Sequence, residues 1–309
     1  MEAFFREHGG AVLSTTFNKY CYVTVRDLPP FFDYRTEIAY SVIERVAAED
    51  EIQHPAVRNA MKMLDIHDIR LTYEADLPAR SGLGSSSSFA AGMLHAFHRL
   101  RGETVQKRSL AQETIFLERQ LCAESGGWQD QIAVIYGGMN RIDFGKEGFR
   151  VSPIQISPGR KKQLDENLLL FFTGFTRLSS EIQKINHVAS DKNTDRLLEM
   201  YRQVDAAEQI LADEACALDE FGRLLDCSWK LKRQTGSRIS TDAIDVLYEK
   251  GRKAGALGGK LLGAGGGGFL LFYVQPEYQE AVRRAMEGLI EVPFHFEEEG
   301  TEVIYETSL

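Results

Sequence analysis

The chain has 309 residues, enough for two domains or for one large domain with its own hydrophobic core. Apolar residues make up 43% and charged residues 26%, which excludes a disordered chain, and the net charge of −9 argues against a nucleic-acid partner, because polyanions are normally bound by a basic face. The apolar runs are too short for a membrane span, so we expect no membrane partner either. The first residues lack a signal-peptide pattern and the four cysteines are scattered, which predicts free thiols and a cytoplasmic protein.

The first part of the chain mixes predicted strands and helices. Residues 20–25 favour a strand because they are β-branched and aromatic, whereas residues 36–49 and 54–64 are predicted to be helices. Residues 69–74 alternate apolar and polar side chains, which indicates a half-buried strand. A helix is expected after the serine run that follows, because apolar residues recur at helical spacing from Phe89 to Leu100.

The middle of the chain carries a predicted helix and a predicted hairpin. The run from Ser109 to Gln112 resembles a capping box, and it predicts a helix that reaches about Glu124. Short apolar stretches in residues 132–144 predict two strands joined by a turn at the Gly137-Gly138 pair.

The rest of the chain predicts two buried strands, at residues 168–172 and 269–274. Helices are expected at residues 179–189, 192–233, 241–254 and 277–289, followed by two short closing strands. Because strands and helices do not alternate strictly, we expect an α+β fold with two lobes. Prolines and a basic cluster interrupt the pattern near 151–166, and the boundary is therefore predicted to separate residues 1–158 from residues 159–309.

A glycine- and serine-rich stretch connects the predicted strand at 69–74 to the next helix. Its residues are Gly82, Leu83, Gly84, Ser85, Ser86, Ser87 and Ser88. Glycines allow a tight turn and close approach to a ligand, and the first backbone N–H groups of a helix have no intrahelical partner. Together with the helix dipole they favour an anion, so the stretch predicts a phosphate-binding loop. A serine-capped helix after an ordinary turn is the alternative interpretation.

A second glycine cluster lies between Lys260 and Phe269, and it includes Gly263, Gly265, Gly266, Gly267 and Gly268. Its text matches G-x-G-x-x-G, but it precedes a strand and does not join a strand to a helix, so a dinucleotide-binding fingerprint is excluded. A Walker A motif is excluded too, because Lys260 is followed by Leu261. A loop with so few side chains beside a buried strand predicts close contact with a ligand or another backbone segment, and a flexible connector is the alternative.

Two carboxylates are candidates for phosphoryl-transfer chemistry. Glu118 lies on the helix predicted from Ser109, and Asp130 follows in a glycine-rich turn. Such a reaction needs a metal ligand and often a carboxylate near the attacking hydroxyl. Each residue alone would fit a structural role equally well, as a solvated helix glutamate or as the aspartate of an Asx turn.

Together, these three features resemble those of the GHMP small-molecule kinases. The stretch from Pro78 to Ser86 is similar to the second motif of this family, and the stretch from Gly263 to Gly268 is similar to the third. The resemblance covers nearly the whole chain and implies an α/β N-terminal lobe and a ferredoxin-like C-terminal lobe. Within the family, residues 8–15, 173–177 and 255–268 are similar to those of the kinases that act on heptose 7-phosphate.

The resemblance implies a role for each candidate residue. Residues 82–87 would bind ATP, Ser86 and Glu118 would hold Mg²⁺, and Asp130 would orient or deprotonate the attacking sugar hydroxyl. The glycines at 265–268 would line the transferred phosphate and the sugar. Arg177 is the candidate for binding a substrate phosphate, because arginine pairs with phosphate in a bidentate fashion.

The implied reaction is phosphorylation of the anomeric hydroxyl of D-glycero-D-manno-heptose 7-phosphate, a step of GDP-heptose biosynthesis. Fucose, galactose or an N-acetylhexosamine are alternative acceptors, and a non-catalytic sugar or nucleotide sensor is a further alternative. The sequence departs from the family in one respect. The first strand and the first motif of the family have no counterpart in it, and residues from Met1 on are similar to the segment that follows this motif in the family. We therefore expect sugar binding to be affected in this form.

Overall fold

The computed structural model describes residues 2–79, 81–174, 191–236 and 239–307. The chain divides into two compact units, each of which collects segments that are far apart in the sequence. Unit 1 comprises Met1–Asn18, Arg80–Leu83 and Gly138–Glu298, and unit 2 comprises Lys19–Ala79, Gly84–Gly137 and Glu299–Leu309. The boundary predicted between residues 158 and 159 divides the sequence into two family domains and does not refer to these compact units. It stays a prediction.

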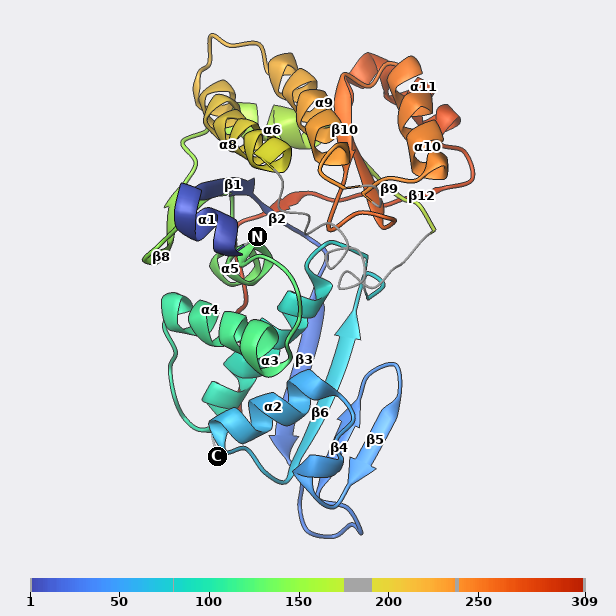
Figure 1. Cartoon of the computed structure of the whole chain (residues 1–309). Helices are drawn as coiled ribbons and strands as arrows, with labels where there is room; N and C mark the ends of the chain where they lie inside the picture. The colour runs from blue at the N-terminus through green and yellow to red at the C-terminus, as the bar shows by residue number, and fades with distance from the viewer. Residues whose placement is uncertain (1, 80, 175–190, 237–238, 308–309) are drawn as a thin grey trace. The chain divides into compact units, whose positions relative to one another are not determined.

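Unit 1 contains three sheets in its described residues (Figure 1). Their strand orders are β1-β7-β8, β10-β11-β9-β12 and β13-β2, and neighbouring strands are antiparallel throughout. The strands are β1 (Gly10–Ser14), β2 (Thr16–Phe17), β7 (Asn140–Gly145), β8 (Gly148–Pro153), β9 (Leu168–Phe172), β10 (Gly258–Leu261), β11 (Phe269–Tyr273), β12 (Ile290–Glu291) and β13 (Phe296–Glu297). The buried strands predicted at 168–172 and 269–274 are thus confirmed as β9 and β11.

The core of unit 1 explains why β9 and β11 are apolar at nearly every position. Alternate residues of these strands, such as Phe171 and Phe272, face a cluster that includes the fully buried Trp229. Leu168 and Tyr273 pack in a second cluster. Because both faces of the sheet are covered, both sets of alternating side chains must be apolar. The helices of unit 1 are α1 (Glu2–His8), α6 (Pro158–Glu166), α8 (Asp191–Ala212), α9 (Asp219–Arg233), α10 (Asp242–Lys253) and α11 (Pro276–Ala285).

Unit 2 is built on one four-stranded sheet with the order β3-β6-β4-β5, in which β4 and β6 are parallel and the other pairs antiparallel. The buried side chains of Ile38, Ile69 and Leu71 belong to this sheet, and Val57 and Met61 on the helix α2 are fully buried as well. The elements are β3 (Cys21–Asp27), β4 (Thr36–Ala39), β5 (Ile43–Val46), η1 (Glu49–Glu51), α2 (Pro55–Leu64), β6 (Ile69–Ala75), α3 (Ser85–Leu100), α4 (Lys107–Phe116), the π-helical turn η2 (Leu117–Leu121) and α5 (Gln129–Tyr136).

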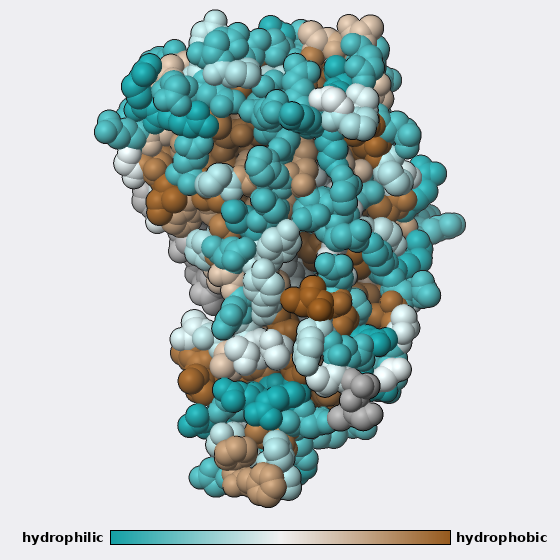
Figure 2. Space-filling view, turned by 180° about the vertical axis from the view of Figure 1, so that it is seen from behind, coloured by the Kyte–Doolittle hydropathy of each residue, from teal (hydrophilic) through white to brown (hydrophobic). Residues whose placement is uncertain are grey.

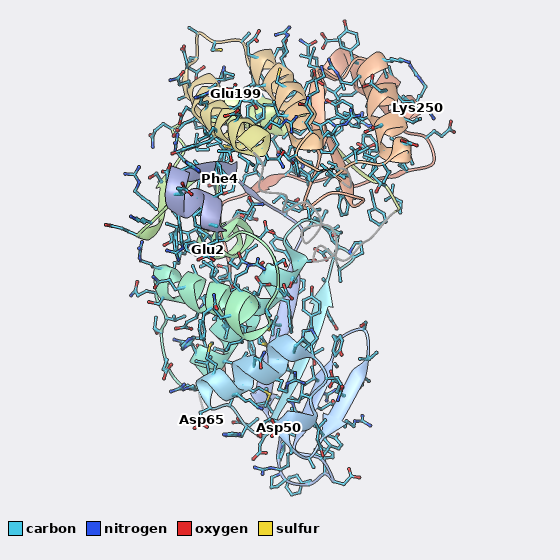
Figure 3. All side chains as sticks on the ribbon, in the orientation of Figure 1. Glu2, Phe4, Asp50, Asp65, Glu199 and Lys250 are labelled. Carbon is cyan, nitrogen blue, oxygen red and sulfur yellow. The ribbon has the colours of Figure 1, made fainter. Side chains whose placement is uncertain are left out.

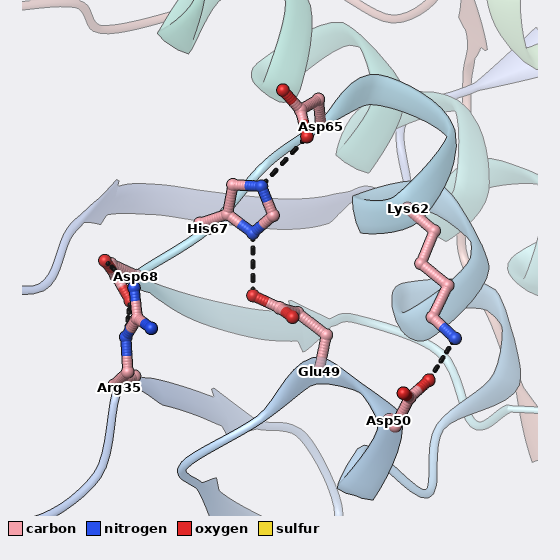
Figure 4. Close-up of polar contacts among 7 residues, drawn as sticks. All are labelled: Arg35, Glu49, Asp50, Lys62, Asp65, His67 and Asp68. Carbon is pink, nitrogen blue, oxygen red and sulfur yellow. Dashed lines mark hydrogen bonds and ion pairs between the residues drawn. The ribbon is translucent and has the colours of Figure 1, made fainter.

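A group of ion pairs joins the turn between α2 and β6 to the segments around η1 and β4 (Figure 4). His67 lies between Glu49 and Asp65, with ring nitrogens 2.7 and 2.9 Å from the carboxylate oxygens, and the hydrogen bonds to Glu49 and Asp65 raise the pKa of His67. The other pairs in this group are Arg35 with Asp68 and Lys62 with Asp50. These contacts are all exposed, so each contributes little to stability.

Four predicted elements differ from the structure. Residues 36–49 form β4, β5 and the start of η1 where a helix was expected, because backbone pairing with β6 and β5 is available there and outweighs the local preference. The helix α4 begins at Lys107, two residues before the predicted capping box, and no side chain caps it. The first predicted strand of 132–144 is the helix α5, in which Ile132 and Ile135 share the buried face. The helix predicted at 192–233 is interrupted between α8 and α9 at residues 213–218.

The predicted helix at 179–189 lies outside the described residues. None of the described helices is long and apolar enough to cross a membrane. On the face drawn in Figure 2, hydrophilic residues predominate and hydrophobic ones form separate smaller groups, as is usual for a folded surface. Charged residues such as Glu2 on α1, Glu199 on α8 and Lys250 on α10 lie on the helices of unit 1 (Figure 3).

Candidate active site

The start of α3 in unit 2 is built as the sequence predicted. Gly84 precedes the helix with φ +75°, a conformation that favours glycine, and the four serines form the first turn. In the described part of the chain no side chain caps this helix end. The first turn therefore retains backbone N–H groups without intrahelical acceptors, at the positive end of a 16-residue helix, which favours an anion.

Glu118 connects this helix start to the π-helical turn η2. Its side chain is only 2% exposed, and its two carboxylate oxygens accept hydrogen bonds from the hydroxyls of Ser86 (3.0 Å) and Ser87 (2.9 Å). The predicted metal ligands Ser86 and Glu118 are therefore side by side, although they are 32 residues apart in the sequence. Single π-helical turns are frequent at functional sites, because they re-aim a side chain within an otherwise α-helical segment.

Two further residues hold the Glu118 carboxylate. The side-chain amide of Gln131 on α5 donates a hydrogen bond to Oε2 of Glu118. The guanidinium of Arg119 lies 3.8 Å from the same oxygen and donates hydrogen bonds to the carbonyls of Ser125 and Gly127 in the segment that precedes α5. Neither Gln131 nor Arg119 was singled out from the sequence, because their relation to Glu118 appears only when η2 and α5 pack together.

Asp130 lies in the first turn of α5, and not in the glycine-rich turn expected from the sequence. It is half-buried, and Nε2 of Gln129 lies 3.4 Å from its Oδ1. Its side chain is next to Gly84: a Cβ atom placed on Gly84 would be 3.7 Å from Cβ of Asp130 and 3.9 Å from its Cγ. The structure thus brings Asp130, the N-terminus of α3 and Glu118 together within unit 2, and their roles in a site stay a prediction.

Buried apolar residues keep these three elements in place. Phe89, Met93 and Phe97 on α3, Leu110 on α4, Leu117 on η2, and Ile132 and Ile135 on α5 are all at most 7% exposed. A rigid apolar core behind a polar site is what holds charged side chains at fixed separations.

The second glycine cluster lies in unit 1, beside the first half of the predicted phosphate loop. A Cβ atom on Gly263 would be 2.5 Å from Cα of Gly82, and a Cβ atom on Gly268 would be 2.2 Å from the carbonyl oxygen of Ser81. Real Cβ atoms do not approach other atoms so closely, so both positions require glycine. The hydroxyl of Ser81 is buried and has no hydrogen-bond partner among the described residues. The prediction of close backbone contact is confirmed, and the segment is not a loose connector.

Two residues that the sequence analysis did not single out for a role fix the ends of this cluster. The ammonium group of Lys232 on α9 donates a 2.6 Å hydrogen bond to the carbonyl of Gly263. At the other end, the backbone N–H and hydroxyl of Thr173 both donate to the carbonyl of Gly268, at 2.9 and 2.8 Å. Thr173 stands in one of the quoted family-like stretches, whereas nothing in the sequence around Lys232 indicates its contact.

The fit of a magnesium ion can be judged from the side chains in unit 2. Mg²⁺ prefers oxygen ligands and is usually bound by one or two carboxylates together with substrate phosphates. Glu118 and Ser86 provide one carboxylate and one hydroxyl, and among the described residues no group of three or more His, Cys, Asp or Glu could hold a metal by itself. This donor set fits an ion shared with a phosphate ligand. Arg177, the predicted phosphate-binding arginine, lies outside the described residues.

Comparison with known proteins identifies the family. The sequence model of the GHMP kinases N terminal domain matches residues 42–138, and that of the GHMP kinases C terminal domain matches residues 211–290. The chain is 30% identical over 233 residues to the D-glycero-alpha-D-manno-heptose 7-phosphate kinase of Campylobacter jejuni, which covers 73% of this chain and 68% of that enzyme. It is also 33% identical over 223 residues to the L-fucokinase/L-fucose-1-P guanylyltransferase of Bacteroides fragilis, of which it spans only 23%.

Solved structures agree on the fold. The crystal structure of a D-glycero-D-manno-heptose 1-phosphate kinase from Bacteroides thetaiotaomicron superposes with a TM-score of 0.76 over 98% of this chain and 93% of that chain, at 24% identity. A mevalonate kinase superposes with a TM-score of 0.71 at 18% identity. The predicted α+β GHMP kinase fold is confirmed by these likenesses. On the strength of both matched domains and the extended identity to the Campylobacter enzyme, the chain belongs to the GHMP kinase family and is an ATP-dependent kinase.

Proposed function

We propose that this kinase phosphorylates a sugar, and that its substrate is D-glycero-D-manno-heptose 7-phosphate, which it converts to the 1,7-bisphosphate. The observation that carries the kinase chemistry is the buried Glu118 carboxylate, which joins the hydroxyls of Ser86 and Ser87 at an anion-favouring helix start with Asp130 nearby. The choice of acceptor is supported by the name of the Campylobacter relative.

Residues 82–87 would hold the phosphates of ATP. The N–H groups at the start of α3 provide donors that need no side-chain cation, which suits a chain with a net charge of −9. Ser86 and Glu118 would hold Mg²⁺, which when bound neutralises charge on the β- and γ-phosphates. Ser87 and Gln131 both hold Oε2 of Glu118, which leaves Oε1, the oxygen that faces Ser86, as the one that would bind the ion.

Asp130 would accept a hydrogen bond from the anomeric hydroxyl and orient its oxygen toward the γ-phosphorus. As the new P–O bond forms and the bond to ADP breaks, the hydroxyl proton would pass to the Asp130 carboxylate and from there to solvent. The transition state of phosphoryl transfer is loose in most analyses, so orientation matters at least as much as proton removal.

Two further stretches are proposed to bind the sugar and its phosphates. The backbone around Gly265 to Gly268 would approach the transferred phosphate and the sugar closely, because it carries no side chains there. Arg177 would bind the 7-phosphate as a bidentate partner, a proposal that rests on the chemistry of arginine alone. The product would enter GDP-heptose biosynthesis. The use of ATP and the four free cysteines support a cytoplasmic location.

A second candidate is a kinase of L-fucose. The fucokinase relative from Bacteroides fragilis is 33% identical over 70% of this chain, slightly more identical than the heptose kinase relative, although the shared part is a minor fraction of that protein. The two candidates differ in one chemical respect, because fucose carries no phosphate group.

The test is ADP release by the purified protein with a panel of acceptors: heptose 7-phosphate, the unphosphorylated heptose, L-fucose, galactose and N-acetylglucosamine. We expect kcat/KM for heptose 7-phosphate to exceed that for every other sugar by roughly 10²-fold or more, because a site that pairs with a phosphate leaves its cation unpaired with the other sugars. A preference for fucose would establish the second candidate. ADP release that no sugar stimulates would refute the proposed function.

A further inference from the structure

The side-chain amide of Gln131 has an unusual environment for a buried group. Gln131 is fully buried, and its nitrogen donates to Oε2 of Glu118. Its carbonyl oxygen, Oε1, is also buried and has no hydrogen-bond partner among the described residues. Because a carboxylate only accepts hydrogen bonds, the N–H side of the amide must face Glu118, and Oε1 is the amide atom left without a partner among the described residues.

Such an unpaired acceptor is unfavourable unless something else supplies a donor. Leaving a buried carbonyl unsatisfied is costly, and an apolar side chain of the same size, such as methionine, would avoid that cost. The structure nevertheless places an amide here, next to the carboxylate that we propose as a metal ligand. A water molecule bound to a metal ion is a strong donor, and Mg²⁺ usually keeps several of its waters.

We infer that Gln131 is a positioning residue for the bound metal ion: its N–H group orients Glu118, and its carbonyl oxygen accepts a hydrogen bond from a water molecule on Mg²⁺. This inference rests on the proposed function, because it takes Ser86 and Glu118 as the metal ligands. It assigns the amide two simultaneous tasks, and each task uses one of the two amide atoms. Groups that orient metal ligands in this way commonly change metal affinity 10–100-fold when they are replaced.

The position of Gln131 on α5 relates it to the reacting groups. It follows Asp130 directly, and consecutive residues of a helix point about 100° apart, so one side chain can face Gly84 while the next faces Glu118. A single short helix would then position both the group that orients the acceptor and the group that orients the metal ligand.

The test uses Gln131→Met, which keeps the volume of the side chain but removes both polar atoms. Gln120→Met is the matched control, because Gln120 lies two residues from Glu118 on η2 and is exposed. The stability of each protein to heat is measured with saturating ADP while Mg²⁺ is titrated, so that the half-saturating Mg²⁺ concentration is obtained from the rise in Tm and not from turnover. Gln131→Met loses the hydrogen bond to the buried Glu118 carboxylate and also removes the unpaired carbonyl, so the Tm without Mg²⁺ and nucleotide is measured first for each protein and the rise with Mg²⁺ is counted from that value.

We expect the half-saturating Mg²⁺ concentration to rise about 10–100-fold in Gln131→Met and to stay unchanged in Gln120→Met. Equal Mg²⁺ dependence of the wild type and Gln131→Met would overturn the inference and leave the proposed function intact. A wild-type protein whose Tm with ADP does not respond to Mg²⁺ would overturn both. Should Gln131→Met not fold, Gln131→Asn serves instead: it withdraws the amide from Glu118 by one methylene, so the same rise supports the inference and wild-type Mg²⁺ dependence contradicts it.

Discussion

Substituting Gly268 by alanine tests the close approach of the two glycine-rich segments of unit 1. The new Cβ atom would lie 2.2 Å from the carbonyl oxygen of Ser81, where nothing closer than about 3.0 Å is tolerated, and the neighbour is backbone and cannot rotate away. Gly268 also has φ +111°, which is strained for any residue with a side chain. The substitution therefore has two penalties, one from the backbone and one from the collision.

A matched control separates the two penalties. Gly148, in the β7–β8 hairpin, has φ +113°, and a Cβ atom there would meet nothing within 4 Å. Gly148→Ala should therefore show the backbone penalty alone, about 1–3 kcal/mol. Gly268→Ala should lose a further 1–3 kcal/mol or so through overpacking, because the segment around Ser81 has to move.

The first assay is unfolding by urea at constant temperature without nucleotide. The second is the measurement of KM for ATP from the rate of ADP release. Gly268→Ala should be less stable than Gly148→Ala and should show a raised KM for ATP, because displacing Ser81 and Gly82 moves the phosphate loop. Gly148→Ala should retain the wild-type KM. If the two variants are equally destabilised, the two glycine-rich segments do not touch as described, and the reasoning is wrong.

Three other predictions concern unit 2. Ser86→Ala should fold normally, because Glu118 keeps its hydrogen bond from Ser87, but kcat at a fixed low Mg²⁺ concentration should fall roughly 10²-fold; wild-type turnover would remove Ser86 from the mechanism. Asp130→Asn should lower kcat roughly 10²–10⁴-fold while the rise in Tm with Mg·ADP is unchanged, and normal turnover would make this carboxylate structural. Burial lowers the pKa of His98, but the hydrogen bonds between its ring and the carboxylates of Glu103 and Glu113 outweigh the effect of burial, so the pKa of His98 is raised. The stabilisation should be full below the unfolded pKa of about 6.5 and lost as the pH rises through the folded value, so the Tm difference between wild type and His98→Gln should be largest near pH 6 and shrink toward pH 9; a difference independent of pH would contradict this assignment.

Several features of the protein were determined by short stretches of the sequence. The strand ending near Ala75, the glycine-led turn and the helix from Ser85 follow from alternation, from the need for positive φ at Gly84 and from the helical spacing of apolar residues. The apolar runs of β9 and β11 likewise predict strands with two covered faces. In each case the signal lies within a window of about ten residues, so no knowledge of distant contacts is needed.

Other features depended on contacts between distant segments. Residues 36–46 became two strands and not a helix because β6 offers backbone partners for β4, an interaction absent from the local sequence. The contacts of Gln131 and Lys232 could not be predicted from the sequence either, since a buried glutamine and a helix lysine are common and only packing sets them against Glu118 and Gly263.

The candidate site combines both kinds of information. The residue types in the phosphate loop, together with Glu118 and Asp130, indicated the chemistry, because carboxylates and helix-start N–H groups have few other uses in this combination. The tertiary structure decided which carboxylate oxygen of Glu118 each serine hydroxyl faces. It also decided that Gly268 has to be glycine. Side-chain chemistry is a property of single residues, whereas distance is a property of the packed core that brings together residues tens to hundreds of positions apart.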